Sequence, residues 1–444
     1  MSSKQTVADG EATSSKNLWS RRDFLRLGSV GLAGATLLWT PGCGGGGERS
    51  DKVVFSFFPD GSGTIQKLID KFNEQNKGKF QVTYQAISLE TREYFDRLKT
   101  EFQAGGGETD VIGGDVPWTA EFAENGWIAD VSSRFSEGER GEFLKGQIQS
   151  LTYQSKIWGK PWFAEVGLLY YRKDLLEQSG FSEPPKTWKE LKEMAEKVVQ
   201  DSGTTYGFVF QGANNETGVC NGLEYIWTHG GDVVEGNKVI IDSPESVAGL
   251  TTEQSMISEG VAPQAVANYT FSGSETAFLN GDSVFCRNWS YLYGLAGNSQ
   301  MSKIKREQVG VSPLPVGEGQ SQRASCLGGW NMLISTSSEM QDEAWEFVRF
   351  MTSEESQKEY SITASTLPTL KTLYDDREIL EEVPVVDLSK EALQNARPRP
   401  VSPYYSQMSR EMAWQFNSVI RSAVSPGTAI KSLQNDLQRI ILQG

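Results

Sequence analysis

Histidine and cysteine are scarce in this chain of 444 residues. It contains one histidine, His229, and four cysteines, Cys43, Cys220, Cys286 and Cys326. Zinc sites and histidine-centred catalytic triads need such residues in close groups, and no spacing in the chain resembles one. We therefore expect no metal site, no cofactor and no triad chemistry.

Positive charge is also in short supply. Lys and Arg number 42 against 57 Asp and Glu, which gives a formal net charge of −15. Nucleic acids and anionic membrane surfaces attract basic proteins, so this balance argues against both as partners. Together with 12 Trp, 14 Tyr and 21 Phe, the acidic composition is typical of a protein that binds something uncharged.

The chain has no long hydrophobic run. The uncharged stretch from Leu27 to Trp39 is shorter than the ~20 apolar residues that a membrane-spanning helix needs. Charged residues including Arg21 and Arg22 precede it, and that order is typical of an export signal. Residues 20–26 resemble the twin-arginine type of bacterial signal. We expect residues 1–42 to be an export signal that is removed; an amphipathic N-terminal helix of a cytosolic protein is the alternative.

Cys43 resembles the acylated cysteine of a bacterial lipoprotein. Gly42 precedes it and a run of glycines follows, which predicts a flexible tether over residues 43–51. Such an anchor would hold the mature protein on the outer face of the cell membrane. Thr40 stands where lipoproteins usually have Leu, and Pro41 follows it, so a simple secreted form is the alternative.

Beyond the tether, apolar residues alternate between the spacing of strands and the spacing of helices. Short runs rich in β-branched and aromatic residues are separated by stretches with apolar residues at i, i+3, i+4 and i+7. The pattern predicts strand, helix, strand, helix and strand over residues 52–58, 64–78, 80–87, 92–106 and 109–115. This order predicts an α/β fold with a parallel sheet covered by helices.

Three later helices carry recognisable start signals. Two are capping boxes, and the third is a serine cap followed by a proline in the first turn. The residues concerned are Thr187 with Glu190, Ser338 with Gln341, and Ser425 with Pro426.

Large aromatic residues stand in three turns rich in glycine and asparagine. These turns are GDVPW (114–118), RNWSYLYG (287–294) and CLGGWNM (326–332). In the last, two glycines before Trp330 allow close backbone approach and leave the indole exposed unless a partner covers it. A single such ring is more often a core residue, but three such turns favour a ligand cleft.

Charged side chains near these turns suit a sugar. A pyranose has an apolar face that buries area against an indole, and its hydroxyl rim favours ionised acceptors and planar donors. The candidates are Asp115, Glu165, Arg92 and Arg399, which lie in loops next to predicted strand ends. The alternative for each is a solvated surface charge.

Six motifs in order resemble the family 1 extracellular solute-binding proteins, the carbohydrate-binding subunits of bacterial ABC transporters. Within that family the chain is most similar to the trehalose/maltose-binding group, from about Lys52 to the C-terminus. The motifs are EVGLLYYRKDLLEQSGFSEPPKTWKEL (165–191), NWSYLYGL (288–295), VGVSPLPVG (309–317), LGGWNMLIS (327–335), EAWEFVRFMTSEESQ (343–357) and RPRPVSPYY (397–405).

The resemblance implies an α/β fold of the periplasmic-binding-protein type II class. Such proteins have two α/β lobes joined by a hinge of several chain crossings, with the sugar held between the lobes. The N-terminal lobe would comprise residues 52–162 and 320–368, and the C-terminal lobe residues 163–319 and 369–444.

The resemblance also implies which residues contact the sugar. Asp115 would contact a glucosyl ring and Glu165 its hydroxyls, although related proteins often have Asp at the second position. The other contacts it implies are stacking by Trp289, Tyr291, Gly329 and Trp330, hydrogen bonds from Arg399, and further contacts from Arg92 and Asp60.

The cysteines permit at most one disulfide within the chain once Cys43 carries lipid. Cys286 and Cys326 each stand three or four residues before a tryptophan of the expected cleft. We therefore predict that they pair, with Cys220 an equal candidate for either partner.

The predicted function is binding, with no bond broken. A monomer would hold a glucosyl disaccharide such as trehalose or maltose and deliver it to membrane permease subunits. The ATPase would be a separate chain, because the phosphate-binding pattern GxxxxGK[ST] is absent. The alternatives are a secreted glycoside hydrolase that uses Asp115 and Glu165 as its two carboxylates, and a sugar-sensing lipoprotein without transport.

Overall fold

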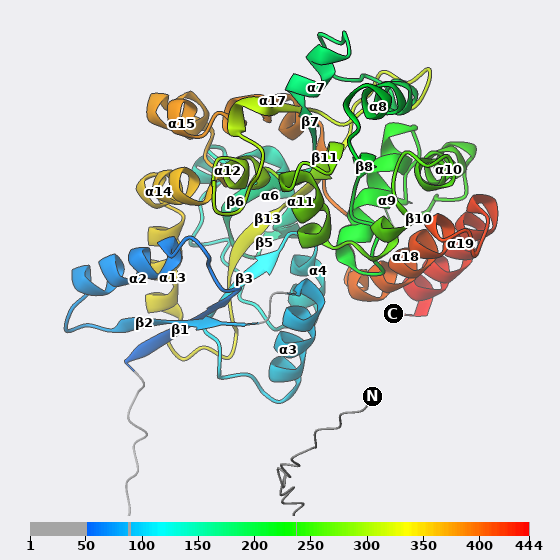
Figure 1. Cartoon of the computed structure of the whole chain (residues 1–444). Coiled ribbons are helices and arrows are strands. Elements are labelled where there is room, and N and C mark those ends of the chain that lie inside the picture. The colour runs from blue at the N-terminus through cyan, green and yellow to red at the C-terminus, as the bar shows by residue number, and fades with distance from the viewer. Residues whose placement is uncertain (1–50, 88–89, 237, 444) are drawn as a thin grey trace, which may run out of the picture. The chain divides into compact units, whose positions relative to one another are not determined.

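The N-terminal segment builds one half of a mixed sheet. A computed structural model describes residues 51–87, 90–236 and 238–443 (Figure 1). Strand β1 (Lys52–Phe57) pairs in parallel with β2 (Gln81–Ala86) and with β3 (Val111–Asp115). Helices α2 (Thr64–Gln75) and α3 (Thr91–Gln103) connect them, and α2 buries Ile65, Leu68, Ile69 and Phe72 on one face. The predicted β-α-β-α-β unit is therefore confirmed.

Later segments complete this sheet to seven strands. They are β6 (Lys160–Val166), β13 (Ser325–Ile334), β14 (Leu367–Pro368) and β15 (Ala396–Arg397). The order is β14-β6-β13-β3-β1-β2, with β15 beside β13. Strand β13 runs antiparallel to both β3 and β6. The sheet is thus mixed, with parallel pairs among β1, β2 and β3 and between β13 and β15.

A second sheet of four strands has the order β12-β7-β11-β8. Its strands are β7 (Leu168–Arg172), β8 (Tyr206–Val209), β11 (Ser283–Asn288) and β12 (Val309–Ser312). The larger helices of this part of the chain are α8 (Trp188–Ser202), α9 (Glu216–Thr228), α10 (Pro244–Ser258) and α11 (Phe271–Leu279). Helix α8 lies against β8 and β11, and α11 lies against β11.

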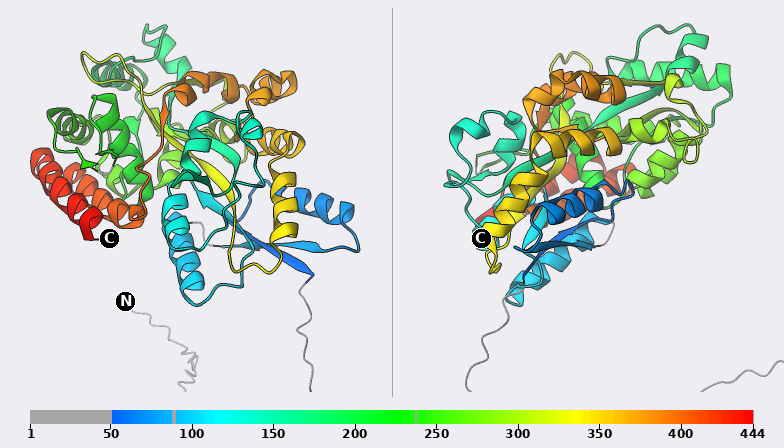
Figure 2. Two further views of the ribbon diagram at one scale, coloured as in Figure 1. Left: turned by 180° about the vertical axis from the view of Figure 1, so that it is seen from behind. Right: turned by 90° about the vertical axis from the view of Figure 1, so that its left-hand side faces the viewer.

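The chain passes between the two sheets three times. It runs from β6 through Gly167 into β7, and from β12 back into β13. The third passage leads from β14 through β15 to α18 (Tyr405–Ile420) and α19 (Pro426–Gln443), the red helices that lie against α9 and α10 (Figure 2). The lobe boundaries given above stay a prediction.

The remaining α-helices and strands connect these elements. They are α4 (Trp118–Glu124), α5 (Glu137–Arg140), α6 (Lys145–Ser150), α7 (Lys173–Gln178), α12 (Leu292–Ala296), α13 (Gln341–Met351), α14 (Glu354–Ala364), α15 (Arg377–Glu382), α16 (Val385–Leu388), α17 (Lys390–Gln394), and the strands β4 (Thr152–Tyr153), β5 (Lys156–Ile157), β9 (Val234–Glu235) and β10 (Lys238–Val239). No helix in the described ranges is long and apolar enough to cross a membrane.

Two of the three predicted helix starts are confirmed. Helix α8 has the complete capping box of Thr187 and Glu190. Helix α19 begins at Pro426, and the Ser425 hydroxyl accepts a hydrogen bond from a backbone N–H of its first turn.

The third predicted helix start is wrong. Helix α13 begins at Gln341 with Met340 as its N-cap, and no side chain caps it. The hydroxyl of Ser338 donates instead to Asp110 at 2.5 Å. The serine is therefore used to fix the preceding loop rather than the helix end.

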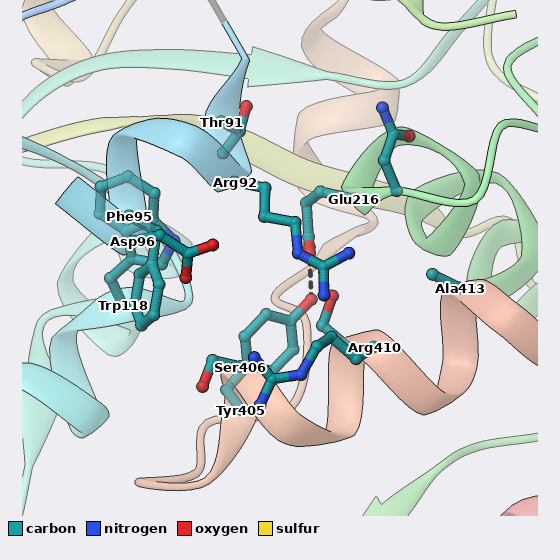
Figure 3. Close-up of a pocket in the computed structure, with 12 residues that line it drawn as sticks. Thr91, Arg92, Phe95, Asp96, Trp118, Glu216, Tyr405, Ser406, Arg410 and Ala413 are labelled. Atoms are coloured by element: carbon teal, nitrogen blue, oxygen red, sulfur yellow. Dashed lines mark hydrogen bonds between the residues drawn. The ribbon is translucent and has the colours of Figure 1, made fainter. Parts of the chain in front are cut away.

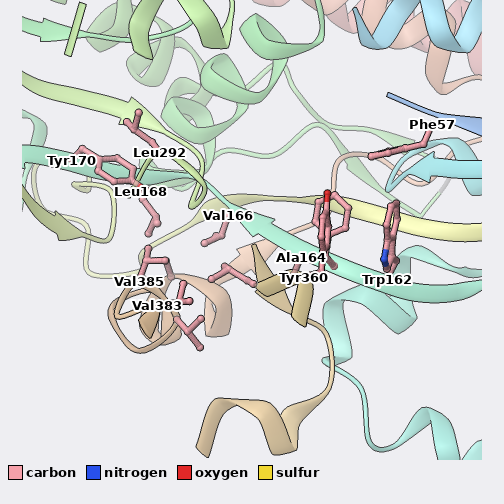
Figure 4. Packing of buried hydrophobic residues seen from close by; sticks show 14 of the residues in the cluster. Phe57, Trp162, Ala164, Val166, Leu168, Tyr170, Leu292, Tyr360, Val383 and Val385 are labelled. Atoms are coloured by element: carbon pink, nitrogen blue, oxygen red, sulfur yellow. The ribbon is translucent and has the colours of Figure 1, made fainter. Parts of the chain in front are cut away.

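One hydrophobic core continues from the first sheet into the second. Buried side chains of β6 and β7, among them Ala164, Val166, Leu168 and Tyr170, lie along this path (Figure 4). At the end near β1, Trp162 stacks on Tyr360 with ring centroids 5.4 Å apart. A shared core is consistent with the grouping of the described residues as one compact unit.

The predicted disulfide between Cys286 and Cys326 is not formed. Both are free and buried, as is Cys220. Cys286 contacts the backbone carbonyl of Ser274 on α11. Cys326 lies instead beside Cys220 of α9. The two thiols therefore sit in different surroundings, and counting residues before each tryptophan did not place them together.

Candidate functional site

Strand β13 lies between the two carboxylates predicted to contact the ligand. In the antiparallel pairing, Trp330 stands opposite Asp115 of β3, and Gly328 stands opposite Glu165 of β6. Directly opposed residues share a face of the sheet, as do residues two apart along one strand. Asp115, Trp330 and Glu165 therefore project from the same face.

Two adjacent glycines of β13 lie beside this group, and only Gly328, which stands opposite Glu165, is on the same face. Gly329 has φ +102°, and a Cβ atom there would lie 2.3 Å from the backbone oxygen of Phe163. A Cβ atom on Gly328 would lie 2.8 Å from the ring of Trp289. The paired glycines thus allow tight strand packing at one position and the approach of an indole from the β11 side at the next.

Trp330 is held by other aromatic rings. Phe57, Phe58 and Trp118 each meet its ring edge-on, with centroids 5.1, 4.8 and 5.5 Å away. Its side chain remains half-buried. Edge-to-face packing fixes an aromatic ring without covering it completely, so Trp330 can present a rigid apolar surface.

Asp115 and Arg399 form a buried ion pair. Two guanidinium nitrogens donate to the two carboxylate oxygens at 2.7 and 3.0 Å, and only 5% of Asp115 and 3% of Arg399 is exposed. Glu216, the first residue of α9, accepts a further bond from Arg399 at 2.6 Å. Burial alone would lower the pKa of Arg399, but neighbouring groups, Asp115 foremost and Glu216 among them, together outweigh it and raise that pKa well above its usual value.

Glu165 has a different environment. Its carboxylate accepts a hydrogen bond from the hydroxyl of Ser290, and it forms no ion pair with a described residue. Burial raises the pKa of Glu165 to about 7, although the bond from Ser290 acts in the opposite direction. The side chain can therefore change between acceptor and donor close to neutral pH.

Trp289 and Tyr291 flank this serine on the chain after β11. The guanidinium of Arg287 lies 4.2 Å from the ring centroid of Trp289. The hydroxyl of Tyr291 donates to Glu275 at 3.1 Å. Both aromatic side chains are half-buried, so each keeps some surface for a ligand.

Arg92 lines a small cavity beside the Arg399 ion pair. The cavity measures about 50 Å³ and lies between α3 and α18, with Glu216, Tyr405 and Arg410 among its walls (Figure 3). Pockets that hold small molecules usually measure ~300–1,000 Å³. A sugar can therefore occupy this part of the molecule only if the elements around the cavity move apart.

Asp60 lies outside this group of residues. Its carboxylate accepts hydrogen bonds from the backbone N–H groups of Ser62 and Ile65, at 2.9 and 2.7 Å. Those bonds fix the turn that leads into α2. A sugar contact for Asp60 stays a prediction, as do the contacts of the other site residues.

The sequence analysis missed Glu216 and Ser290. Glu216 accepts hydrogen bonds from Tyr405 and Ser409 of α18 as well as from Arg399. The sequence offered one signal for the position of Glu216. Asn215 caps a helix, since its side chain accepts a hydrogen bond from the backbone N–H of Thr217, and an acidic residue is favourable in the first turn of a helix. Ser290 stands within the quoted NWSYLYGL motif, but its pairing with Glu165 joins two sheets and has no local pattern.

The chemistry of this arrangement is that of recognition. Carboxylates can accept from hydroxyls, a guanidinium can donate to them, and the indoles offer apolar surface. In residues 51–87, 90–236 and 238–443, no three His, Cys, Asp or Glu side chains are grouped as a metal site requires.

Comparison with known proteins gives consistent matches. The family model of the bacterial extracellular solute-binding proteins matches residues 58–358. A probable ABC transporter-binding protein of Deinococcus radiodurans is 34% identical over 342 residues, which cover 75% of this chain and 80% of that protein. The maltose-bound MalE3 of T. maritima is 36% identical, with a TM-score of 0.82 over 87% of this chain and 99% of that one.

A more distant relative is also a binding protein. A maltotriose-binding protein of Pyrococcus abyssi is 24% identical over 311 residues, which cover 69% of this chain and 64% of that protein. These relatives are binding proteins, and the glycoside hydrolase alternative is excluded. The chain therefore belongs to the bacterial extracellular solute-binding proteins, as the exported, non-enzymatic substrate-binding component of an ABC sugar transporter with the type II periplasmic-binding-protein fold.

Proposed function

We propose that this protein binds a neutral glucosyl disaccharide, such as maltose or trehalose, and hands it to its permease. The observation that carries the proposal is the convergence of Asp115, Glu165 and Trp330 on one face of the seven-stranded sheet. Trp289 approaches the same face over Gly328. Two indoles and two carboxylates suit two linked pyranose rings, each with an apolar face and a hydroxyl rim.

Arg399 supports the proposal with a donor that is not used by the protein. Its Nε atom is buried and has no hydrogen-bond partner in the described part of the chain. A buried unpaired donor is costly, and a sugar hydroxyl can accept from it. The proposal therefore gives this atom a role in the bound state.

The relatives support the sugar class. The structure of T. maritima MalE3, at 36% identity, is described as maltose-bound. Other structures of the same fold, at 23% and 20% identity, are complexes with ribitol and D-mannitol. The disaccharide is thus favoured by the more similar protein, and by the two aromatic surfaces of this chain.

In the proposed mechanism the sugar stabilises the closed arrangement. The elements that carry Asp115 and Arg399 separate, the sugar enters, and contacts from both sides then favour reclosure. The closed form docks on the permease, and a separate ATPase drives uptake.

Calorimetry of the mature protein against maltose, trehalose, sucrose, palatinose and glucose tests the proposal. We expect a disaccharide to bind at micromolar or tighter affinity, ~−8 kcal/mol or better, and glucose to bind more weakly. Heat from an amino acid or an oligopeptide, with none from any sugar, would refute it.

We also propose twin-arginine export and lipid anchoring of a monomer through Cys43. The residues on which these two proposals rest lie outside the described ranges. Replacing Arg21 and Arg22 together by Lys should retain the protein inside the cell. Cys43→Ser should be exported but released, because acyl chains supply ~0.8 kcal/mol per buried CH₂. Firm membrane attachment of the Cys43→Ser protein in cell fractionation would contradict the anchor.

A further inference from the structure

Two of the three passages between the sheets touch each other, and the third pairs with one of them. The backbone N–H of Gly167, between β6 and β7, donates to the carbonyl of Cys326 at the start of β13 at 3.3 Å. Ser325 and Cys326 pair in turn with Ala396 and Arg397 of β15. Any change in the angle between the sheets must therefore bend the chain near Gly167 and Cys326.

A buried ion pair lies against this point. Glu224 of α9 and Arg287 of β11 are 2% and 1% exposed. Two guanidinium nitrogens of Arg287 donate to the two oxygens of Glu224 at 2.7 and 2.5 Å. Gln211 completes the site, because its amide oxygen accepts from Arg287 at 3.0 Å and its amide nitrogen donates to the Arg287 carbonyl at 2.7 Å.

The pair contacts both passages directly. The carboxylate of Glu224 accepts from the backbone N–H of Cys326 at 2.9 Å. A Cβ atom on Gly167 would lie 1.9 Å from the same carboxylate and 2.6 Å from the Arg287 guanidinium. Gly167 is therefore held against the pair so closely that no other residue fits without displacing it.

Arg287 also contacts the candidate sugar surface. Its guanidinium lies over the Trp289 ring, 4.2 Å from the centroid. The same ring packs against Gly328 of β13. One arginine thus joins the backbone between the sheets to an aromatic side chain of the site.

We propose that Glu224 and Arg287 are positioning residues that couple the angle between the two sheets to the placement of Trp289. A buried ion pair adds little net stability compared with apolar packing, so stability alone does not account for it. A bidentate pair does impose a fixed geometry. Here that geometry is shared by Gly167, Cys326 and Trp289. The Trp289 part of the inference rests on the proposed function; the hinge part does not.

Three variants test this coupling. Glu224→Gln keeps the shape of the side chain and removes its charge. Arg287→Lys keeps the charge and removes the bidentate geometry. Gly167→Ala inserts one methyl group into the contact and leaves both charges in place.

The matched control is Arg172→Lys. Arg172 forms a bidentate pair with Asp174, at 2.8 and 2.7 Å, and is only 9% exposed. Arg172 is the last residue of β7, at the end of the strand away from Gly167. It therefore reports the cost of disturbing a partly buried arginine pair without disturbing the passages between the sheets.

The measurement is the distance distribution between spin labels at exposed positions 70 of α2 and 431 of α19, by pulsed electron resonance. The labels are attached through Asp70→Cys and Lys431→Cys in full-length chain that carries Cys43→Ser, since the three other cysteines are buried. Each variant is measured without sugar, with maltose and with trehalose, and its affinity is measured by calorimetry.

We expect the wild type and Arg172→Lys to give the same distributions. Glu224→Gln, Arg287→Lys and Gly167→Ala should give broader or shifted distributions without sugar, and at least tenfold weaker binding of whichever sugar the wild type binds. Unchanged distributions in variants that fold, judged by circular dichroism, would overturn the inference. If neither sugar binds the wild type, the proposed disaccharide is wrong, and the sugar-free distributions still decide the hinge part.

Discussion

Two buried carboxylates flank β13, and their surroundings differ. Asp115 forms an ion pair with Arg399, which also donates a hydrogen bond to Glu216. Glu165 has a serine hydroxyl as its partner and a pKa of about 7. One side of the site is thus an ionic cluster of Asp115, Glu216 and Arg399. The other consists of Glu165, Ser290 and Trp289, among which the described structure has no ion pair.

The difference separates a side of the candidate site that joins distant elements from a side that offers a carboxyl group close to neutrality. The ionic cluster joins β3 to α9 and to the chain before α18, so its contribution depends on the contact between these elements. Glu165 can donate or accept a hydrogen bond near neutral pH. Substitutions on the two sides should therefore fail in different ways.

The largest effect is expected from Arg399→Met. The change leaves the buried Asp115 and the partly buried Glu216 without their cation, and breaking a buried pair in this way costs about 3–5 kcal/mol. Urea unfolding should show that loss, and sugar binding should disappear. The double variant Asp115→Asn with Arg399→Met should recover part of the stability. A loss below about 1 kcal/mol in the single variant would show that the pair is not buried in solution.

A smaller loss is expected from Gly329→Ala, which disturbs the strand between the two sides. A non-glycine residue at this positive φ costs about 1–3 kcal/mol, and the new methyl group also meets a backbone oxygen at 2.3 Å. Gly126→Ala is the control, because Gly126 has φ +70° and no atom within 4 Å. Equal melting temperatures for the two variants would mean that the close contact at Gly329 is relieved at no cost.

Glu165→Gln should change the pH dependence of stability. The folded pKa of about 7 is raised above the ordinary value of 4.5, so between those values the folded state keeps a proton that the unfolded state has lost. Stability therefore falls as pH rises through this range, by about 1 kcal/mol between pH 6 and 7. Denaturant titrations at the two pH values should show a fall that is smaller by about 1 kcal/mol in Glu165→Gln than in wild type, because the buried Glu253, whose pKa is raised to about 8, adds the same further fall to both proteins. The same fall in both proteins would assign it to another group.

The smallest effect is expected from an exposed pair. Arg377 and Glu381 form an ion pair at 2.7 Å with side chains 92% and 62% exposed. Replacing Arg377 by Ala should cost less than about 0.5 kcal/mol, because solvent screens such pairs. This variant is the baseline for Arg399→Met, since both remove one arginine from a carboxylate. Similar losses in the two variants would remove the distinction between buried and exposed pairs.

The sequence predicts the local parts of this fold well. Alternation and helical spacing locate β1 to β3 and their helices, because burial of one face imposes those periods on the chain. The cap at Thr187 is equally local. The Ser338 box failed because the same serine has a competing partner, Asp110, which lies far away in the sequence.

The site could be predicted only through its motifs. Asp115, Glu165 and Trp330 belong to segments that the family resemblance picks out, and the structure brings them to one sheet face. The pairing of Glu165 with Ser290 and of Arg399 with Glu216 depends on how strands and helices from different segments meet. Neither composition nor spacing contains that information, and the same reason explains the wrong cysteine pair.

A crystal structure of the complex with maltose or trehalose, whichever binds more tightly, tests the central claim most directly. We predict one sugar ring against Trp330 with its hydroxyls on Asp115 and Arg399, and the second ring near Trp289 with a hydroxyl on Glu165. A sugar bound away from this face of β13, or bound without contact to either carboxylate, would contradict the account.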